Sequence, residues 1–74
     1  MLRRNFSVKG RVEISSKKFG KMKLSISGNR VKVTHFSGVG ETFVFPDSQA
    51  AIEWAASEVA HYVANRCHVR TSWD

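Results

Sequence analysis

The chain has 74 residues, a mass of 8.3 kDa and a formal net charge of +6 at pH 7. A chain of this length can form only a single small domain, which excludes a multidomain organisation. Its 42% of hydrophobic residues, with five Gly and one Pro, is typical of a globular protein rather than a disordered one. We therefore expect residues 1–74 to form one domain.

The sequence shows no sign of an oxidising compartment or of a membrane. Cys67 is the single cysteine, so no internal disulfide can form. The first residues, Met1-Leu2-Arg3-Arg4-Asn5, turn polar at once and lack the apolar stretch of a signal peptide. No apolar run reaches the length needed to span a membrane. We therefore expect a soluble, cytoplasmic protein, with residues 1–5 forming a flexible basic arm.

The charge is divided unevenly along the chain. Residues 1–40 hold ten basic residues and one acidic residue, Glu13, for a net charge of +9, whereas residues 41–74 have a net charge of −3. A concentrated positive region suggests an anionic partner, most often nucleic acid. The alternative is that the charge only keeps a small basic protein soluble.

The first predicted strand spans residues 6–14, where apolar and polar residues alternate. The apolar side contains Phe6, Val8, Val12 and Ile14. The polar side contains Ser7, Lys9, Arg11 and Glu13. This period of two predicts a half-buried strand. Gly10 interrupts its apolar side, either as a bulge or because another element approaches the backbone closely there.

A β-hairpin is predicted over residues 21–34, with Gly28-Asn29 as a two-residue turn that has positive φ at Gly28. This turn places Ser27 opposite Arg30. The apolar pairs that then face each other are Ile26–Val31 and Leu24–Val33, with Met22 opposite His35. Turn and pattern therefore agree on one register and one apolar face.

A fourth strand is predicted from Glu41 to Phe45, after a loop that contains Ser37-Gly38-Val39-Gly40. We expect Phe43 opposite His35 and Phe45 opposite Val33, which keeps both phenylalanines and His35 on the inner face. Pro46 ends this strand, and Asp47 or Ser48 can cap the element that follows.

A helix is predicted over residues 47–66, where the period of the apolar residues changes to 3.6 and alanine is frequent. The arc expected to face the sheet contains Ile52, Ala55, Ala56, Val59, Tyr62 and Val63. Residues 67–74 form a tail, either a short edge strand or docked coil. The predicted fold class is α+β: a four-stranded antiparallel meander sheet over residues 6–45 with one C-terminal helix packed on one face (ββββα).

In topology, residues 8–64 of this predicted layout are similar to small DNA-binding sheets followed by a helix. Examples are the arm-binding domains of phage integrases and the plant domains that read the major groove with three strands. The resemblance implies a sheet that contacts DNA. Because no motif is shared and this chain has an additional strand, no functional residue is transferred from those families.

The sheet face opposite the helix carries the candidate nucleic-acid-binding residues. They are Lys9, Arg11, Lys21, Lys23, Arg30, Lys32 and Phe36. Cations alternate with hydroxyls, because the hairpin register places Ser25 opposite Lys32 and Thr34 opposite Lys23. Such a face suits phosphate contact, with Phe36 and Phe19 as stacking or wedging groups. The alternative is a solvated face whose lysines discourage aggregation.

Catalytic and metal-binding motifs are not recognisable. Gly38-Val39-Gly40 lacks the strand–loop–helix setting of a phosphate loop. Cys67 and His68 are adjacent and do not readily form a positioned thiol–imidazole pair. The histidines and Cys67 do not have zinc-ligand spacing. We expect no enzymatic activity, no cofactor and no metal.

Trp54 is predicted on the outer face of the helix, about 200° from Ile52 at about 100° per residue. Its expected neighbours there are Ala50, Ser57, His61 and Ala64. A tryptophan framed by small residues suggests a protein interface, with Trp54 and His61 in a homodimer. Alternatively, the tail folds back over Trp54 with Val69 and Trp73.

The sequence thus predicts a small, non-enzymatic nucleic-acid-binding protein that uses the basic face of its sheet. DNA and RNA are not distinguished. The alternative is a protein-interaction module, for example a small inhibitor or adaptor from a phage or mobile element. Its basic sheet would then cover an acidic or nucleic-acid-binding surface of a larger protein.

Overall fold

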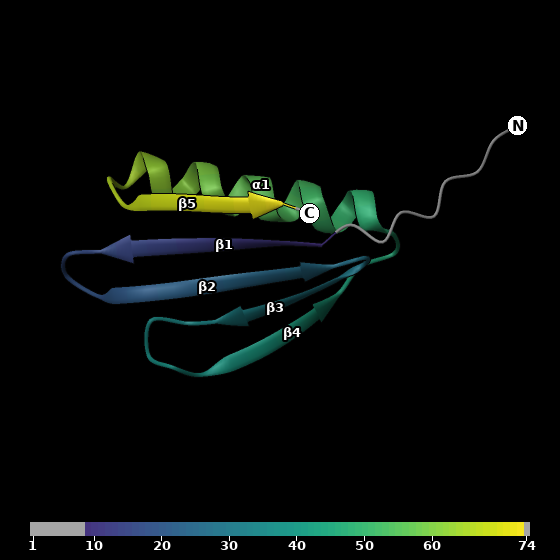
Figure 1. Ribbon diagram of the computed structural model, residues 1–74, viewed down its shortest axis with the longest axis horizontal. Coiled ribbons are helices and arrows are strands. Elements are labelled where there is room, and N and C mark those ends of the chain that lie inside the picture. The colour runs from purple at the N-terminus through teal and green to yellow at the C-terminus, as the bar shows by residue number, and fades with distance from the viewer. Residues whose placement is uncertain (1–8, 74) are drawn as a thin grey trace, which may run out of the picture.

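The computed structural model describes residues 9–73, which form an antiparallel sheet with one helix on one of its faces (Figure 1). The elements in chain order are β1 (Lys9–Ser16), β2 (Gly20–Ser27), β3 (Arg30–Thr34), β4 (Gly40–Val44), α1 (Ser48–Ala64) and β5 (His68–Trp73). The predicted α+β class with an antiparallel sheet and one helix is therefore confirmed. The predicted arm and the predicted strand positions Phe6 and Val8 lie outside the described residues.

The sheet has five strands, in the order β4-β3-β2-β1-β5. The four predicted strands form the expected meander, and the tail, predicted as either a short edge strand or docked coil, adds a fifth strand at the edge. The tail returns along β1 as an antiparallel strand, with Val69 opposite Ile14 and Trp73 opposite Gly10. After α1, Arg66 adopts a positive φ of 64° and reverses the chain toward β1. β1 would otherwise expose a row of unpaired backbone groups, and β5 provides their hydrogen-bonding partners.

The β2–β3 hairpin has the predicted register, with Ser27 opposite Arg30 and Leu24 opposite Val33. Gly28 has a φ of +61°, as the turn requires. The predicted β3–β4 register is wrong by four residues, because Phe43 lies opposite Val31 rather than opposite His35. A shift by an even number of residues preserves the face of every side chain, so Phe43 stays on the inner side of the sheet.

The shifted register also changes the position of His35, which was predicted to lie beside Phe43 on the inner face. His35 lies just after β3 and is half-exposed, and its Nε2 is 2.6 Å from Oε1 of Glu41. Its backbone N–H donates to the carbonyl oxygen of Val39 at 2.8 Å, which closes the loop between β3 and β4. The pairing of β3 with β4 ends with Thr34 opposite Gly40, so His35 lies in the loop and not opposite Phe43.

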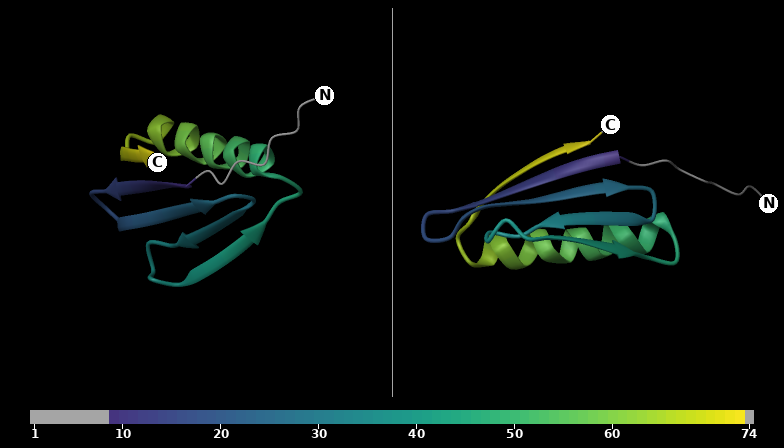
Figure 2. Two further views of the ribbon diagram at one scale, coloured as in Figure 1. Left: turned by 45° about the vertical axis from the view of Figure 1, so that its right-hand side comes forward. Right: turned by 90° about the horizontal axis from the view of Figure 1, so that it is seen from below.

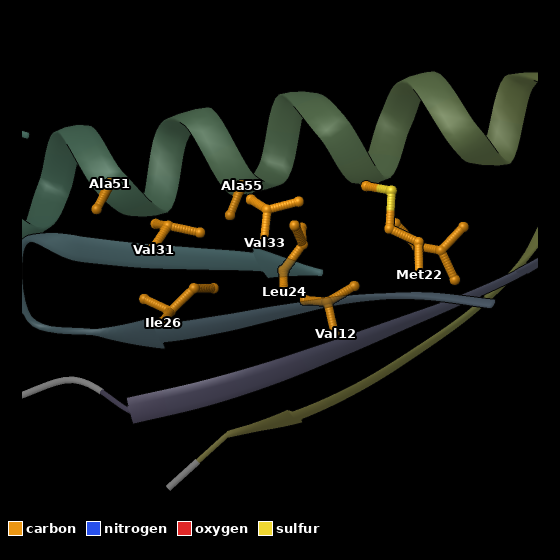
Figure 3. Packing of buried hydrophobic residues seen from close by; sticks show 9 residues of the cluster. Val12, Met22, Leu24, Ile26, Val31, Val33, Ala51 and Ala55 are labelled. Carbon is orange, nitrogen blue, oxygen red and sulfur yellow. The ribbon is translucent and has the colours of Figure 1, made fainter. Parts of the chain in front are cut away.

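The core lies between the inner face of the sheet and α1 (Figure 3). Its fully buried residues are Val12, Ile14, Met22, Leu24, Ile26, Val31, Val33, Ala51 and Ala55. All seven strand residues come from the apolar side of the predicted alternations, so parity in β1, β2 and β3 is confirmed. Complete burial of each large aliphatic side chain stabilises the fold by roughly 1.5–3 kcal/mol.

The helix begins where the sequence predicted, but it is rotated about its axis relative to the predicted arc. Asp47 is the N-cap, and its Oδ1 accepts a hydrogen bond from the backbone N–H of Ala50 at 2.8 Å. Ala51 and Ala55 are the buried helix positions, whereas Val63, from the predicted arc, is 56% exposed. Alanine is small, so these two residues let the helix backbone approach the sheet closely. Ala55, Val59 and Tyr62 of the predicted arc do face the core, so the arc centred on Ile52 is correct only in part, and the buried side of the helix is rotated toward Ala51.

This rotation turns Trp54 toward the sheet. Its ring centroid lies 5.2 Å from that of Phe43 and 5.7 Å from that of Phe45, and it packs against the core. The prediction that Trp54 faces outward is therefore wrong, and so is the alternative in which the tail covers it. His61 is exposed and its ring contacts that of Tyr62. The homodimer was predicted because Trp54 was expected to be exposed on the outer face of the helix, so the structure removes the reason for that prediction.

Gly10 is the place where a second element approaches the backbone, which was one of its two predicted roles. A Cβ at this position would lie only 2.3 Å from Cε3 of Trp73. Trp73 on β5 lies directly opposite Gly10 on β1, and its indole, although Trp73 is 48% exposed, covers this glycine. This contact anchors the end of β5 to β1.

α1, the one helix within residues 9–73, lacks the length and apolarity needed to cross a membrane.

We expect Trp54→Ala to lower the free energy of unfolding by about 2–3 kcal/mol, less than for a fully buried tryptophan because Trp54 is only partly buried. Urea denaturation measures this change. The control Val63→Ala truncates an exposed helix residue and should change stability by no more than about 0.5 kcal/mol. A Trp54→Ala variant as stable as the wild type, but with lost self-association, would restore the outward assignment.

We expect Gly10→Ala to displace the indole of Trp73 and to destabilise the domain by about 1–3 kcal/mol, because the added methyl occupies the position of the ring. The indole N–H resonance of Trp73 in NMR spectra reports the displacement. Gly40→Ala is the control, since a Cβ at Gly40 would meet only the carbonyl oxygen of Val33 at 3.8 Å. An unchanged Trp73 resonance in Gly10→Ala contradicts the contact.

Candidate functional site

The face of the sheet opposite α1, here called the outer face, is not covered by any element of residues 9–73 (Figure 2). Strand parity places on it all six predicted cations, Lys9, Arg11, Lys21, Lys23, Arg30 and Lys32. Each of the six is exposed. The structure thus brings these six side chains together on one layer, as the sequence predicted.

Within the outer face, no cation lies directly opposite another cation on a neighbouring strand. The central row across the sheet reads Thr42, Lys32, Ser25, Arg11 and Ser72. The next two rows read Val44, Arg30, Ser27, Lys9 and Gly40, Thr34, Lys23, Glu13, Arg70. Like charges directly opposite each other destabilise a sheet, and the intervening hydroxyls avoid this. The same hydroxyls can donate hydrogen bonds to an anion held by the adjacent cations.

Glu13 is the one carboxylate on the outer face within the described part of the chain. In register it lies between Lys23 on β2 and Arg70 on β5. Even so, the ion pair found among residues 9–73 is that of His35 with Glu41, at the opposite edge of the sheet. The cations of the outer face are therefore not neutralised by carboxylate partners within this region.

The opposite layer carries the opposite charge. α1 contains Glu53 and Glu58 and no Lys or Arg, and Asp47 caps its first turn. The molecule therefore separates charge across its thickness, with cations on the sheet and carboxylates on the helix side. The basic first half of the sequence thus forms the outer face of the sheet, and the acidic second half supplies the carboxylates on the helix side.

The dimensions of the outer face suit an extended anion. Neighbouring strands are about 4.8 Å apart, so the cations from β3 to β5 span about 14 Å across the sheet, and cations two residues apart on one strand are separated by about 6.7 Å. Arg11 lies near the centre and lines three shallow hollows of about 280, 290 and 260 Å³. An elongated charged ligand can contact several of these cations at once.

Phe36 is the predicted site residue that the structure places elsewhere. It follows β3, packs against the core, and lies 6.0 Å from Tyr62 of α1 between ring centroids. The same distance separates Phe36 from Phe19, which is 61% exposed in the turn between β1 and β2. The prediction of Phe36 on the outer face is wrong because β3 ends at Thr34 and the chain turns there.

Arg70 belongs to the outer face and was not among the predicted site residues. β5 places it opposite Glu13, with His68 opposite Ser15 and Ser72 opposite Arg11. The sequence did contain a sign of this position. In the weak alternation of the tail, Val69, Thr71 and Trp73 share one side and Arg70 lies on the opposite side. Pairing this alternation with β1 would have added Arg70 to the predicted face.

The metal-ligating side chains and the cysteine of residues 9–73 are further candidate groups for a site. No group of three His, Cys, Asp or Glu side chains in this region is arranged to hold a metal ion. Cys67 is half-buried, and its Sγ lies 4.0 Å from the carbonyl oxygen of Asn65. No hydrogen bond joins this thiol to an imidazole within residues 9–73.

No protein-family model matches the chain, and searches of curated proteins and of solved structures found no significant match. The topological similarity to DNA-binding sheets followed by a helix thus remains an expectation. Function must be inferred from the residues of the chain themselves.

Proposed function

We propose that this protein is a non-enzymatic module that binds the phosphate backbone of nucleic acid with its outer face. The observation that carries the proposal is the arrangement of the cations. Seven exposed basic side chains, the six predicted ones and Arg70, share an uncovered sheet face with a single carboxylate, among residues 9–73. Ordinary surface charge mixes both signs, whereas this protein separates them onto two layers.

Lysine and arginine contribute to such binding mainly by neutralising phosphates and releasing counterions. Ser25 and Ser27 lie in register between cations on both sides and can donate hydrogen bonds to the same phosphate oxygens. Arg11 and Arg30 add planar donors that can bind a phosphate through two hydrogen bonds. Contacts of this kind position a nucleic acid without reading its sequence.

The salt dependence of binding tests this proposal. If about four phosphates are contacted, the slope of log affinity against log salt is about −3.6 for duplex DNA and about −2.8 for a single strand. The duplex value corresponds to a roughly 150-fold loss of affinity between 50 and 200 mM salt. The double variant Lys23→Ala/Lys32→Ala should stay folded, bind more weakly, and have a duplex slope shallower by about 1.8.

The matched control for this experiment is Lys23→Arg/Lys32→Arg, which keeps both charges and should retain the slope. Fluorescence anisotropy with labelled single- and double-stranded DNA and RNA measures the affinities. Absence of binding to all four at 50 mM salt rejects the proposal. The outer face would then suit an acidic surface of a larger protein, which is the alternative that the same charges allow.

Glu13→Gln gives a second test, in the direction of tighter binding. It removes the single carboxylate from the outer face of residues 9–73. Affinity at low salt should rise about two- to threefold, because a unit charge about 7 Å from a phosphate repels it by about 0.6 kcal/mol in water. Glu53→Gln changes the net charge equally but lies on α1, and should leave affinity nearly unchanged. Equal effects of the two variants would indicate attraction by net charge alone rather than binding at the outer face.

A further inference from the structure

A second feature lies at the end of the molecule where the β1–β2 turn, the β3–β4 loop and the end of α1 meet (Figure 1). It is a hollow of about 400 Å³ with a mainly apolar lining. The lining includes Ser16, Phe19, Phe36, Tyr62, Asn65 and Cys67. This volume lies within the range of small-ligand sites. The three aromatic rings come from three different segments that only the folded structure brings together.

The rings form a continuous row, with centroids 6.0 Å apart between Phe19 and Phe36 and again between Phe36 and Tyr62. Two of them pack against neighbours, but Phe19 is 61% exposed at the mouth of the hollow. An exposed aromatic ring beside an apolar hollow provides a stacking surface for a flat ligand. Water covers this surface in the free protein, so its burial by a ligand is favourable.

Hydrogen-bonding groups line the same hollow. The hydroxyl of Tyr62 is protonated at neutral pH, as in any tyrosine, and can donate. Burial, with electrostatic contributions from Glu58 and Cys67, raises the pKa of Tyr62 further. The side-chain amide of Asn65 donates through Nδ2 to the carbonyl oxygen of His61 at 2.8 Å, which leaves its Oδ1 as an acceptor. The lining of the hollow therefore includes one residue with a hydrogen-bond donor and one with an acceptor.

Positive charge connects the hollow to the outer face. The ammonium group of Lys18 lies 5.4 Å from the ring centroid of Phe19, next to Lys17 in the same turn. The turn leads directly into β2, whose first outer-face cation is Lys21. A chain of phosphates on the outer face can thus continue past Lys18 to the mouth of the hollow.

We infer that this hollow binds one unpaired base of a single-stranded nucleic acid, stacked on Phe19, while the outer face holds the phosphates of the same strand. The inference rests on the proposed function and specifies its substrate class. A paired base cannot enter without leaving its stack, at a cost of a few kcal/mol, so single strands are preferred to duplexes. Every base has a flat face, so the site is expected to tolerate different bases.

The test compares an oligothymidine strand with an abasic strand of the same length, which has the same phosphates but no bases. The wild type should bind oligothymidine roughly 5- to 100-fold more tightly, the usual effect of stacking one base on an aromatic side chain. Phe19→Ala and Phe19→Leu should remove this preference and leave affinity for the abasic strand unchanged. Phe19→Leu keeps apolar bulk and removes the ring, so it separates stacking from general packing. Val63→Ala, an exposed apolar residue outside the hollow, is the control.

A second readout uses Cys67, the single cysteine of the chain, which lines the hollow. Oligothymidine should slow the alkylation of Cys67 by a maleimide, and the abasic strand should not. Equal affinity of the wild type for the two strands, or equal alkylation rates with both, overturns the inference and leaves the proposed function intact. Failure to bind either strand at low salt overturns the inference, and it overturns the proposed function as well only if double-stranded DNA and RNA are not bound either.

Discussion

The packing of α1 on one face of the sheet is the interaction on which the rest of this structure depends. Apolar residues at alternate positions of β1, β2 and β3 form a continuous inner surface, and Ala51 and Ala55 bring the helix onto it. Because side chains alternate along a strand, covering this surface commits every intervening residue to the outer face. The cations are therefore concentrated by the same periodicity that builds the core.

Cross-strand register explains how a small sheet can hold this much charge. Ser25, Ser27 and Thr34 lie beside cations, so no two cations are directly opposite each other. The carboxylates of α1 lie on the other layer and do not neutralise the outer face. A face with this arrangement remains open to an external anion, which is the basis of the proposed binding to nucleic acid.

β5 has consequences for both candidate sites. Its pairing with β1 adds Arg70 to the outer face, and the turn that leads into it places Asn65 and Cys67 beside Phe36 and Tyr62. The covering of Gly10 by Trp73 holds the far end of the strand. One short strand thus extends the cationic surface and completes the aromatic hollow, so the two sites share a structural element as well as a proposed ligand.

The sequence by itself determined the parity of β1 to β3 and the Gly28-Asn29 hairpin, and hence the six cations of the outer face. It also limited the helix cap to Asp47 or Ser48, of which the structure uses Asp47. These features depend on local alternation and turn chemistry, which a sequence displays directly. Only the tertiary structure decided which side of α1 faces the sheet, because alanine content is compatible with several arcs and close approach favoured Ala51 and Ala55. The tertiary structure also decided the place of Trp54, Phe36 and β5, since each depends on contacts between segments distant in the chain. A weak pattern such as residues 68–73 becomes a strand only when a neighbouring edge offers it hydrogen bonds.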